Sequence, residues 1–491
     1  MTLSQPWRTA VAISMVAFAR LAVADICSVI KQQGIEIEKP LTLNYYKDLR
    51  KYWSAACGDL KPKCIADPSS ALEIPTIVKQ LHNFDDLFAV KSGGHMPNNG
   101  FASIQDGLLI STKNLDQVIY HPEDHTAVIG PGLSWEDAQK GLNGTGRALV
   151  GGRLGGVGVG GYMLGGKLQL LAMVGISLTR LGRLSFLSSQ YGWAANNVVN
   201  FEVVLANGTA VNASAKENAD LFAALKGGGN NFGIITAYTL QTHPQNHKIW
   251  GGNYIFTADK TPQVLSALRD FTEHYPDDKA AIIVTCEHGL LLHTWIMFLF
   301  YDGPEPPEGV FTTLQQSNIS MLPKPGTATM TWLVTLPQSS GLAYLILKQL
   351  KHNDFFILHG QRYTIATETT PLPNKTVGAG VMQTYYDHWF NVTNTVLEVR
   401  NMLGSIAFQP MPRTITSKAK ARGGDLLDFP TDQDYIIIEL DFSYASAADD
   451  AKIDAANQNL YGGFDNIISD NIDKGLLPDV YRPLFMNDAF D

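Results

Sequence analysis

Between residues 60 and 245, apolar runs with helical spacing alternate with the short apolar runs that are typical of buried strands. The pattern predicts, in order, a helix at 70–86, strands at 87–90 and 107–112, and a strand, turn and helix across 126–142. Ser134 is a candidate N-cap of the last helix, since Asp137 follows three residues later. This part of the chain therefore alternates α and β elements, joined by glycine-rich connections.

Alternating apolar residues on both sides of Asn207-Gly208 predict a β-hairpin at 198–214, because Asn-Gly is the strongest short hairpin signal. A short helix that ends at Gly227 and a strand that ends before Pro244 follow it. The first part of the chain is thus expected to close with paired strands.

From about residue 250 the glycine-rich loops disappear. Long strand-like runs at 281–301 and 434–446 are separated by helical stretches such as 261–275. A chain of 491 residues is also too long for one small domain. We therefore expect a second α+β domain, which shapes a substrate pocket.

Composition narrows the class of protein. Hydrophobic residues make up 45% of the chain and charged residues 17%, which is typical of a well-packed globular protein. The formal net charge is −9, and no block of lysines and arginines stands out. We therefore expect neither nucleic acid nor an anionic membrane as a partner. The cysteines and histidines lack the spacing of a metal site, so no metal is expected.

The N-terminus has the pattern of a secretory signal peptide. Arg8 precedes the apolar run Ala10–Ala19, and small residues at Ala22–Ala24 offer a cleavage site. An N-terminal helix or membrane anchor is the alternative, but the run is shorter than the roughly 20 residues that span a bilayer. We expect residues 1–24 to be removed, leaving a secreted protein without a membrane partner.

Sequons and cysteines agree with an oxidising, secretory compartment. Six asparagines begin an N-x-S/T sequence and are candidate glycosylation sites: Asn143, Asn207, Asn212, Asn318, Asn374 and Asn391. Cys27, Cys57 and Cys64 lie close to the mature start, so one N-terminal disulfide is expected. Sequence alone leaves its pairing open.

Three glycine tracts carry the candidate chemistry. In the first, the pair Gly93-Gly94 follows a strand and precedes His95, so the backbone is expected to approach a ligand closely. The second, at 151–166, contains a GxGxxG pattern, but it lacks the acidic residue about 20 positions later that a Rossmann site needs. The third lies at 226–236. Together they favour a dinucleotide threaded across several backbone N–H groups.

Four motifs, "KSGGH", "VGVGGYMLGG", "SSQYGWAANNVVNFEVVLANG" and "DLFAALKGGGNNFGIIT", follow in this order. Together they resemble the FAD-linked oxidases of the vanillyl-alcohol-oxidase superfamily, in the berberine-bridge-enzyme-like branch, and above all its secreted fungal members associated with secondary metabolism. The likeness is strong over 57–245, weaker afterwards, and visible again at "LFMNDA". It implies an α+β fold of two domains: a PCMH-type FAD-binding domain at 25–245, a substrate domain of antiparallel sheet and helices at 246–460, and a C-terminal segment, 461–491, that returns to the FAD domain.

The resemblance also implies which residues hold FAD. His95 matches the histidine that is bonded covalently to the flavin ring methyl; the alternative is a histidine that only contacts the cofactor. Leu154 stands where many relatives have a second linking cysteine, so a single attachment is expected. The full set of expected FAD-binding residues is Ser92, Gly93, Gly94, His95, Gly152, Gly156, Gly160, Gly161, Asn197, Gly233, Ile234 and Asn487. For the disulfide, the resemblance implies Cys27 with Cys64.

The catalytic base is less clear, because the terminal motif lacks the tyrosine that some relatives use. The candidates from the second domain are Tyr385, Tyr386, His388 and Gln409. A tyrosine near a flavin can accept a hydroxyl proton while hydride leaves the carbon, although its ordinary pKa of about 10 requires help from a neighbour. For either tyrosine, core packing on a helix is the alternative.

The expected function is an FAD-dependent oxidase. Hydride passes from a small molecule, an alcohol for preference, to the flavin, and oxygen then takes the electrons to give hydrogen peroxide. Oxidative cyclisation and carbohydrate oxidation on the same fold are alternatives, and a nicotinamide-dependent Rossmann dehydrogenase is a rival.

A last rival is an inactive product of a faulty gene model. The apolar segment Lys167–Arg183 interrupts a loop that is short in relatives, and Gly166-Lys167 can be encoded by the usual start of an intron. Relatives also continue beyond the motif at Asp491. We expect the segment to be a retained intron, the true C-terminus to be longer, and the chain as written to bind flavin poorly.

Overall fold

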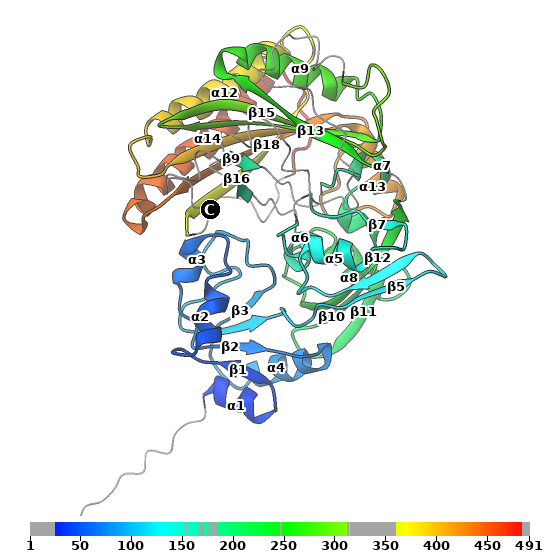
Figure 1. Cartoon of the computed structure of the whole chain (residues 1–491), viewed down its shortest axis with the longest axis vertical. Coiled ribbons are helices and arrows are strands. Elements are labelled where there is room, and N and C mark those ends of the chain that lie inside the picture. The colour runs from blue at the N-terminus through cyan, green and yellow to red at the C-terminus, as the bar shows by residue number, and fades with distance from the viewer. Residues whose placement is uncertain are drawn as a thin grey trace, which may run out of the picture.

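The computed structural model describes residues 25–153, 155–165, 171–173, 176–178, 184–245, 248–311, 314 and 360–483. Figure 1 shows two halves, with most elements up to β12, in blue through cyan to green, below, and most elements from β13 onward, in green to red, above. Among the described residues, one-turn 3-10 helices lie between the longer elements, at Ala71–Glu73, Ala194–Asn197, Ala258–Lys260 and Ala447–Asp449.

The first sheet has the order β1-β2-β4-β3, with β2, β4 and β3 parallel and β1 antiparallel at the edge. Its strands are β1 (Glu36–Glu38), β2 (Cys64–Asp67), β3 (Phe88–Lys91) and β4 (Leu108–Ser111). Its helices are α1 (Ile26–Gln32), α2 (Leu43–Leu49), α3 (Ala55–Asp59) and α4 (Ile74–Leu81). A disulfide joins Cys27 in α1 to Cys64 in β2, which confirms the pairing that the resemblance implied.

The second sheet has the order β11-β10-β12-β6-β5, and β7 also pairs with β12. The strands are β5 (Val118–His121), β6 (Thr126–Ile129), β7 (Arg147–Leu149), β10 (Val198–Val204), β11 (Ala210–Ser214) and β12 (Ile234–Pro244). The helices are α5 (Trp135–Gly141), α6 (Val159–Leu164), α7 (Ser188–Tyr191) and α8 (Ala219–Leu225). The predicted hairpin at Asn207-Gly208 is β10–β11, and Ser134 caps α5 by accepting from the Asp137 backbone N–H at 3.1 Å.

The third sheet is antiparallel, with the order β13-β15-β14-β17-β18-β16. Its strands are β13 (Trp250–Thr257), β14 (Ala280–Gly289), β15 (Leu292–Tyr301), β16 (Arg362–Pro371), β17 (Leu403–Met411) and β18 (Tyr435–Tyr444). Helices described in this part of the chain are α9 (Thr261–Glu273), α12 (Gly378–Asn394), α13 (Arg413–Ala421) and α14 (Asp450–Asp473).

The third sheet presents two different faces. Its outer face carries side chains such as Ile406, Phe408 and Leu440, which form one core with α9, α12 and α14. Figure 1 shows α9 and α12 above β15, and the first half below the sheet. The inner face packs on the first half through residues such as Phe298 and Ile437. A ligand held by the first half therefore faces the inner side of this sheet.

These features confirm the predicted two-part α+β fold. Several predicted element and domain boundaries differ from the observed ones. The run at 281–301 is a hairpin of β14 and β15, not one strand, and Pro244 lies within β12. The boundary predicted at residue 461 falls inside α14, which packs on α12 and β16, so the sheet domain extends to Asp473. No helix among the described residues is long and apolar enough to span a membrane.

Within the unusual segment Lys167–Arg183, the described backbone is a two-stranded antiparallel ribbon. It consists of β8 (Leu171–Met173) and β9 (Ile176–Leu178), and β9 lies against β14. The other residues of the segment lie outside the described part of the chain, as does the Leu154 position.

A candidate flavin site

Two glycine loops cross in direct contact below the third sheet. A Cβ on Gly93 would lie 2.6 Å from the Gly158 backbone, and a Cβ on Gly158 would lie 2.5 Å from that of Gly93. Next to the crossing, a Cβ on Gly160 would lie 2.7 Å from Ser92 Oγ. No side chain larger than hydrogen fits at these distances. The glycines are therefore needed for the close approach of the two loops, and they leave backbone N–H groups open to a ligand.

A cavity of about 690 Å³ begins at this crossing and lies between the first and second sheets. Its walls come from all three glycine tracts and from β3 and the end of β10. Eight of the expected FAD-binding residues line it: Ser92, Gly93, Gly94, His95, Gly160, Gly161, Gly233 and Ile234. The volume is in the range of cofactor pockets, which is about 300–1,000 Å³. A cavity walled by glycines along its length fits a dinucleotide such as FAD.

His95 stands where this cavity approaches the third sheet. Its ring is half-buried and lines the cavity, and its Nδ1 lies 3.3 Å from the Gly93 carbonyl oxygen. Trp53 lies parallel to it, with 6.1 Å between ring centroids and 16° between planes. A histidine in this place can reach the end of a ligand that extends out of the cavity toward the inner face of the sheet.

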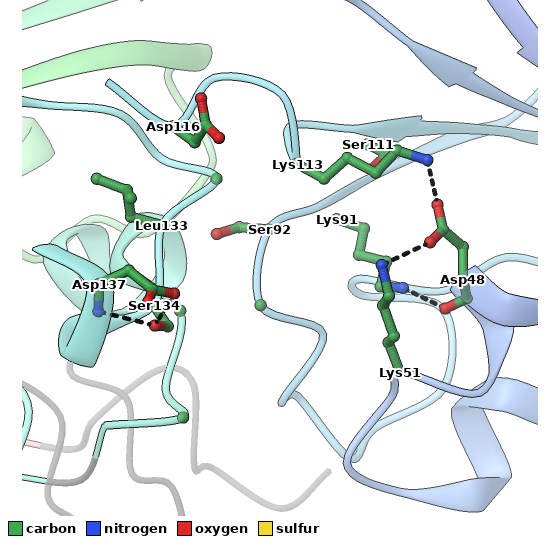
Figure 2. A pocket seen from close by; sticks show the side chains of 14 residues that line it. Asp48, Lys51, Lys91, Ser92, Ser111, Lys113, Asp116, Leu133, Ser134 and Asp137 are labelled. Carbon is green, nitrogen blue, oxygen red and sulfur yellow. Dashed lines mark hydrogen bonds and ion pairs between the residues drawn. The ribbon is translucent and has the colours of Figure 1, made fainter. Parts of the chain in front are cut away.

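A second cavity, of about 380 Å³, lies on the other side of the same crossing. Figure 2 shows it, with Lys51, Lys91 and Lys113 converging on Asp48. Gly156, expected at the flavin, lines this second cavity. Burial lowers the pKa of the Lys91 ammonium to about 8. Because the ammonium also donates to the Asp48 backbone oxygen, it anchors the strand that leads into the glycine pair.

The carboxylates behind this second cavity do not form a metal site. Glu38, Asp48 and Asp67 lie within ligand distance of one another. However, the Lys113 ammonium sits among them, at 2.9, 2.6 and 2.7 Å from their oxygens. The lysine thus supplies the positive charge that a metal ion would otherwise bring.

Two further expected FAD-binding residues, Gly152 and Asn197, stand apart from the cavity linings. Gly152 packs under the indole of Trp135, to which a Cβ would approach within 2.4 Å. Asn197 is buried, and its amide donates to the Tyr191 and Trp193 carbonyl oxygens at 3.2 and 2.8 Å. Both residues shape the second sheet's connections without lining the cavity. Asn487, also expected at the flavin, lies outside the described residues.

Three of the four candidate bases lie on α12, in the core beyond the outer face of the third sheet. The Tyr385 hydroxyl bonds to Thr370 Oγ1 at 2.8 Å, and the Tyr386 hydroxyl bonds to His293 Nε2 at 2.7 Å. His388 bonds to the Leu460 carbonyl oxygen of α14 at 3.0 Å. Burial raises the pKa of both tyrosines, which disfavours ionisation. The structure favours the core-packing alternative for both tyrosines.

Gln409 differs from the other three, because it lies on the inner face. It is paired with Ile437 of the inner-face core and is 7% exposed. Its Oε1 has no hydrogen-bond partner among the described residues. Of the candidates, it is the one whose side chain lies on the side of the sheet that faces the first half.

Sequence reasoning missed a row of buried carboxylates on the inner face: Glu287, Glu439 and Asp441. Ser405 donates to Glu287 Oε2 and lies opposite Asp441 in the sheet register. Strict alternation in "IIIELDFSY" could have placed Glu439 and Asp441 on one face, but it does not say which face is buried against the other half.

Arg153, from the second glycine tract, lies near this row. Its side chain is buried, and Nε and one terminal nitrogen have no hydrogen-bond partner among the described residues. Burial lowers the pKa of Arg153 to about 10, while the charge of Glu439 acts in the opposite sense. A cation and carboxylates are therefore gathered where the two halves meet.

Comparison with known proteins agrees with this site. The family model of the FAD binding domain matches residues 62–171. An uncharacterized FAD-linked oxidoreductase of Arthroderma benhamiae is 42% identical over 464 residues, which cover 94% of this chain and 86% of the relative. The FAD-dependent monooxygenase drtC of Aspergillus calidoustus is 29% identical over 442 residues, covering 87% of this chain and 76% of that protein.

Solved structures show the same fold at lower identity. A glucooligosaccharide oxidase of Acremonium strictum has a TM-score of 0.70 at 19% identity, covering 95% of this chain and 90% of that structure. Berberine bridge enzyme of Eschscholzia californica has a TM-score of 0.66 at 17% identity, covering 95% and 88%.

Proposed function

The chain belongs to the FAD-linked oxidoreductases of the vanillyl-alcohol-oxidase superfamily, in the berberine-bridge-enzyme-like branch, and from this we propose that it is an oxidase of a small-molecule alcohol with FAD bonded to His95. FAD supplies the hydride acceptor when it is bound. The observation that carries the proposal is the glycine-walled cavity, which has His95 at the end nearest the third sheet. Oxygen is the proposed second substrate, with hydrogen peroxide as product.

The chain's own residues bind the cofactor, enclose the substrate and accept its proton. The crossed loops at Gly93 and Gly158 offer their backbone N–H groups to the pyrophosphate. The inner face of the third sheet closes the substrate side, and its buried carboxylates are positioned to accept the proton of a substrate hydroxyl. We place the base in this row, with Glu439 beside Arg153 as its first member, and not among the residues of α12.

We also propose that the protein is secreted and glycosylated, and that it serves a secondary-metabolite pathway. The five sequon asparagines within the described residues are all exposed, as glycosylation requires: Asn143, Asn207, Asn212, Asn374 and Asn391. The sixth, Asn318, lies outside them. The disulfide between Cys27 and Cys64 supports an oxidising compartment. Retention of the untagged chain inside its native cells would contradict secretion.

The covalent link is tested with His95→Ala. Wild-type protein precipitated with acid should keep its flavin and give a fluorescent band on a denaturing gel. His95→Ala should bind FAD but release it to the supernatant, because the backbone loops that hold the pyrophosphate are unchanged. A wild-type protein that loses all its flavin on precipitation would show that the link is absent, while FAD binding itself would stand.

We further propose that the active enzyme is formed without Lys167–Arg183. Gly165, which lines the flavin cavity, lies just before this segment. The segment is therefore inserted next to a cavity wall, where added chain competes with the ligand for space.

A further inference from the structure

A short segment, Tyr52–Ala55, connects the loop of His95 to the edge of the third sheet. Three hydrogen bonds hold it: Trp53 N–H to Gly94 O at 3.0 Å, Tyr363 N–H to Ser54 Oγ at 3.3 Å, and Ala55 N–H to Gln361 O at 2.8 Å. The first bond reaches the glycine pair, and the other two reach Tyr363 of β16 and Gln361 just before that strand. The segment thus spans the two halves beside the flavin cavity.

The indole of Trp53 lies between the His95 loop and β16. On one side it stacks on Tyr363, with 4.0 Å between ring centroids and 18° between planes. On the other side it lies parallel to the His95 imidazole. Tyr363 is 5% exposed and is part of β16, so it forms a fixed support behind the indole. The three rings form a continuous stack that ends at the imidazole.

The imidazole of His95 needs such a support, because the backbone before it does not fix the direction of the side chain. Gly93 and Gly94 precede it, and Gly94 has a φ of +66°, a conformation that glycine adopts freely. Within the loop, its Nδ1 lies 3.3 Å from the Gly93 oxygen. A parallel aromatic face restricts rotation of the imidazole about its side-chain bonds while leaving the ring edge open.

We propose that Trp53 is the positioning residue for covalent attachment of the flavin, an inference that rests on the proposed link at His95. Attachment joins an imidazole nitrogen to the ring methyl carbon. One methyl C–H and one imidazole N–H are lost, and the two electrons and two protons released are taken up by oxygen as hydrogen peroxide. The nitrogen must point at the carbon for this bond to form, and misplacement by about 1 Å can slow a reaction about 100-fold.

This role makes attachment dependent on the third sheet. Because the support behind Trp53 is Tyr363 of β16, the imidazole is held in place only when the sheet is docked on the first half. Flavin is then attached only to chains in which the third sheet has folded and docked on the first half.

The test uses Trp53→Leu, Trp53→Phe and, as a matched control, Tyr46→Leu. Tyr46 lies nearby in α2, is 39% exposed and contacts only Tyr45 among the described aromatic pairs. The variants are made in the form of the full-length protein that retains FAD, with or without Lys167–Arg183. This protein is first depleted of flavin, and FAD is then added. Acid-resistant and acid-released flavin are then measured over time.

We expect Trp53→Leu to attach flavin about 10- to 100-fold more slowly while total bound FAD stays within about twofold of wild type. Trp53→Phe should recover most of the rate, because it keeps a flat ring against the imidazole, and Tyr46→Leu should match wild type. Attachment by Trp53→Leu at the wild-type rate would overturn the proposal. Loss of total FAD in both Trp53 variants would also overturn it, since the residue would then be merely structural. Bound but wholly releasable FAD in wild type would overturn the link at His95 itself, and this proposal with it.

Discussion

His243 is a buried histidine that closes a hydrogen-bond network at the start of β10. Its ring is buried, stacks on Tyr191 at 3.7 Å, and donates from Nε2 to Asn197 Oδ1 at 2.8 Å. Because the Asn197 amide in turn holds the Tyr191 and Trp193 carbonyls, the imidazole closes a small network next to β10. The network gives Asn197 a structural role at the start of β10.

This network predicts a specific loss of stability in acid. Burial, with the nearby charges of Arg422 and Arg147, lowers the pKa of His243 to about 3. Above pH 6.5 the ring is neutral in both states, so its contribution is fully present. As the pH falls from about 6.5 toward 3, the imidazole is protonated in the unfolded chain but stays neutral in the folded chain. The free energy of unfolding therefore falls by up to about 1.4 kcal/mol per pH unit.

Urea unfolding between pH 7.5 and 4.5 measures this effect. His243→Gln keeps a donor for Asn197 but cannot titrate, so its stability should depend less on pH than that of the wild type. His274→Gln is the matched control, because the His274 side chain is 70% exposed. Equal pH slopes for wild type and His243→Gln would show that the buried ring does not contribute.

At the scale of elements, the crossing of the two glycine loops is the most sensitive feature. Gly158→Ala should abolish FAD binding and lower the free energy of unfolding by about 1–3 kcal/mol, because its Cβ would meet backbone that no side-chain rotation can move. Gly462→Ala in α14 is the control: nothing lies within 4 Å of its Cβ, so it should stabilise the helix by about 0.5–1 kcal/mol. Calorimetry and flavin content give both readouts, and full FAD occupancy in Gly158→Ala would refute the steric argument.

Elements also show where sequence reasoning works and where it stops. The cap at Ser134 and the hairpin at Asn207-Gly208 were predictable, because each depends on residues a few positions apart. The contact of Gly93 with Gly158 was not, since it joins loops from different sheets. The tyrosines of α12 show the same limit. Their spacing indicates a buried helical face but not which side of a sheet that face covers, and that side separates a core residue from a catalytic one.

At the scale of the whole molecule, a buried arginine joins three distant segments. Arg362, at the start of β16, binds Asp450 of α14 through two nitrogens at 2.6 Å and Asp59 of α3 at 2.6 Å. Asp59 belongs to the first half, and Asp450 covers the third sheet. Together with Tyr52–Ala55, this contact holds the edge of the substrate domain against the flavin domain.

The whole-molecule prediction concerns the segment Lys167–Arg183. A chain that lacks it should retain FAD near one per chain, whereas the 491-residue chain should retain about tenfold less, because the segment adjoins the Gly165 wall of the cavity. Flavin absorbance of both purified chains checks this, and sequencing of the transcript identifies the natural form. A message that contains the segment, with full FAD occupancy of its product, would contradict the prediction.

The glycine crossing also has a consequence for the order of folding. Gly93 and Gly158 belong to loops that leave different sheets, so neither loop alone forms a wall of the cavity. Contacts between segments distant in sequence are made late in folding, since the chain must first lose the entropy of the intervening loop. We therefore expect FAD to bind after the two sheets have docked, so that its binding energy stabilises the finished fold instead of guiding its formation.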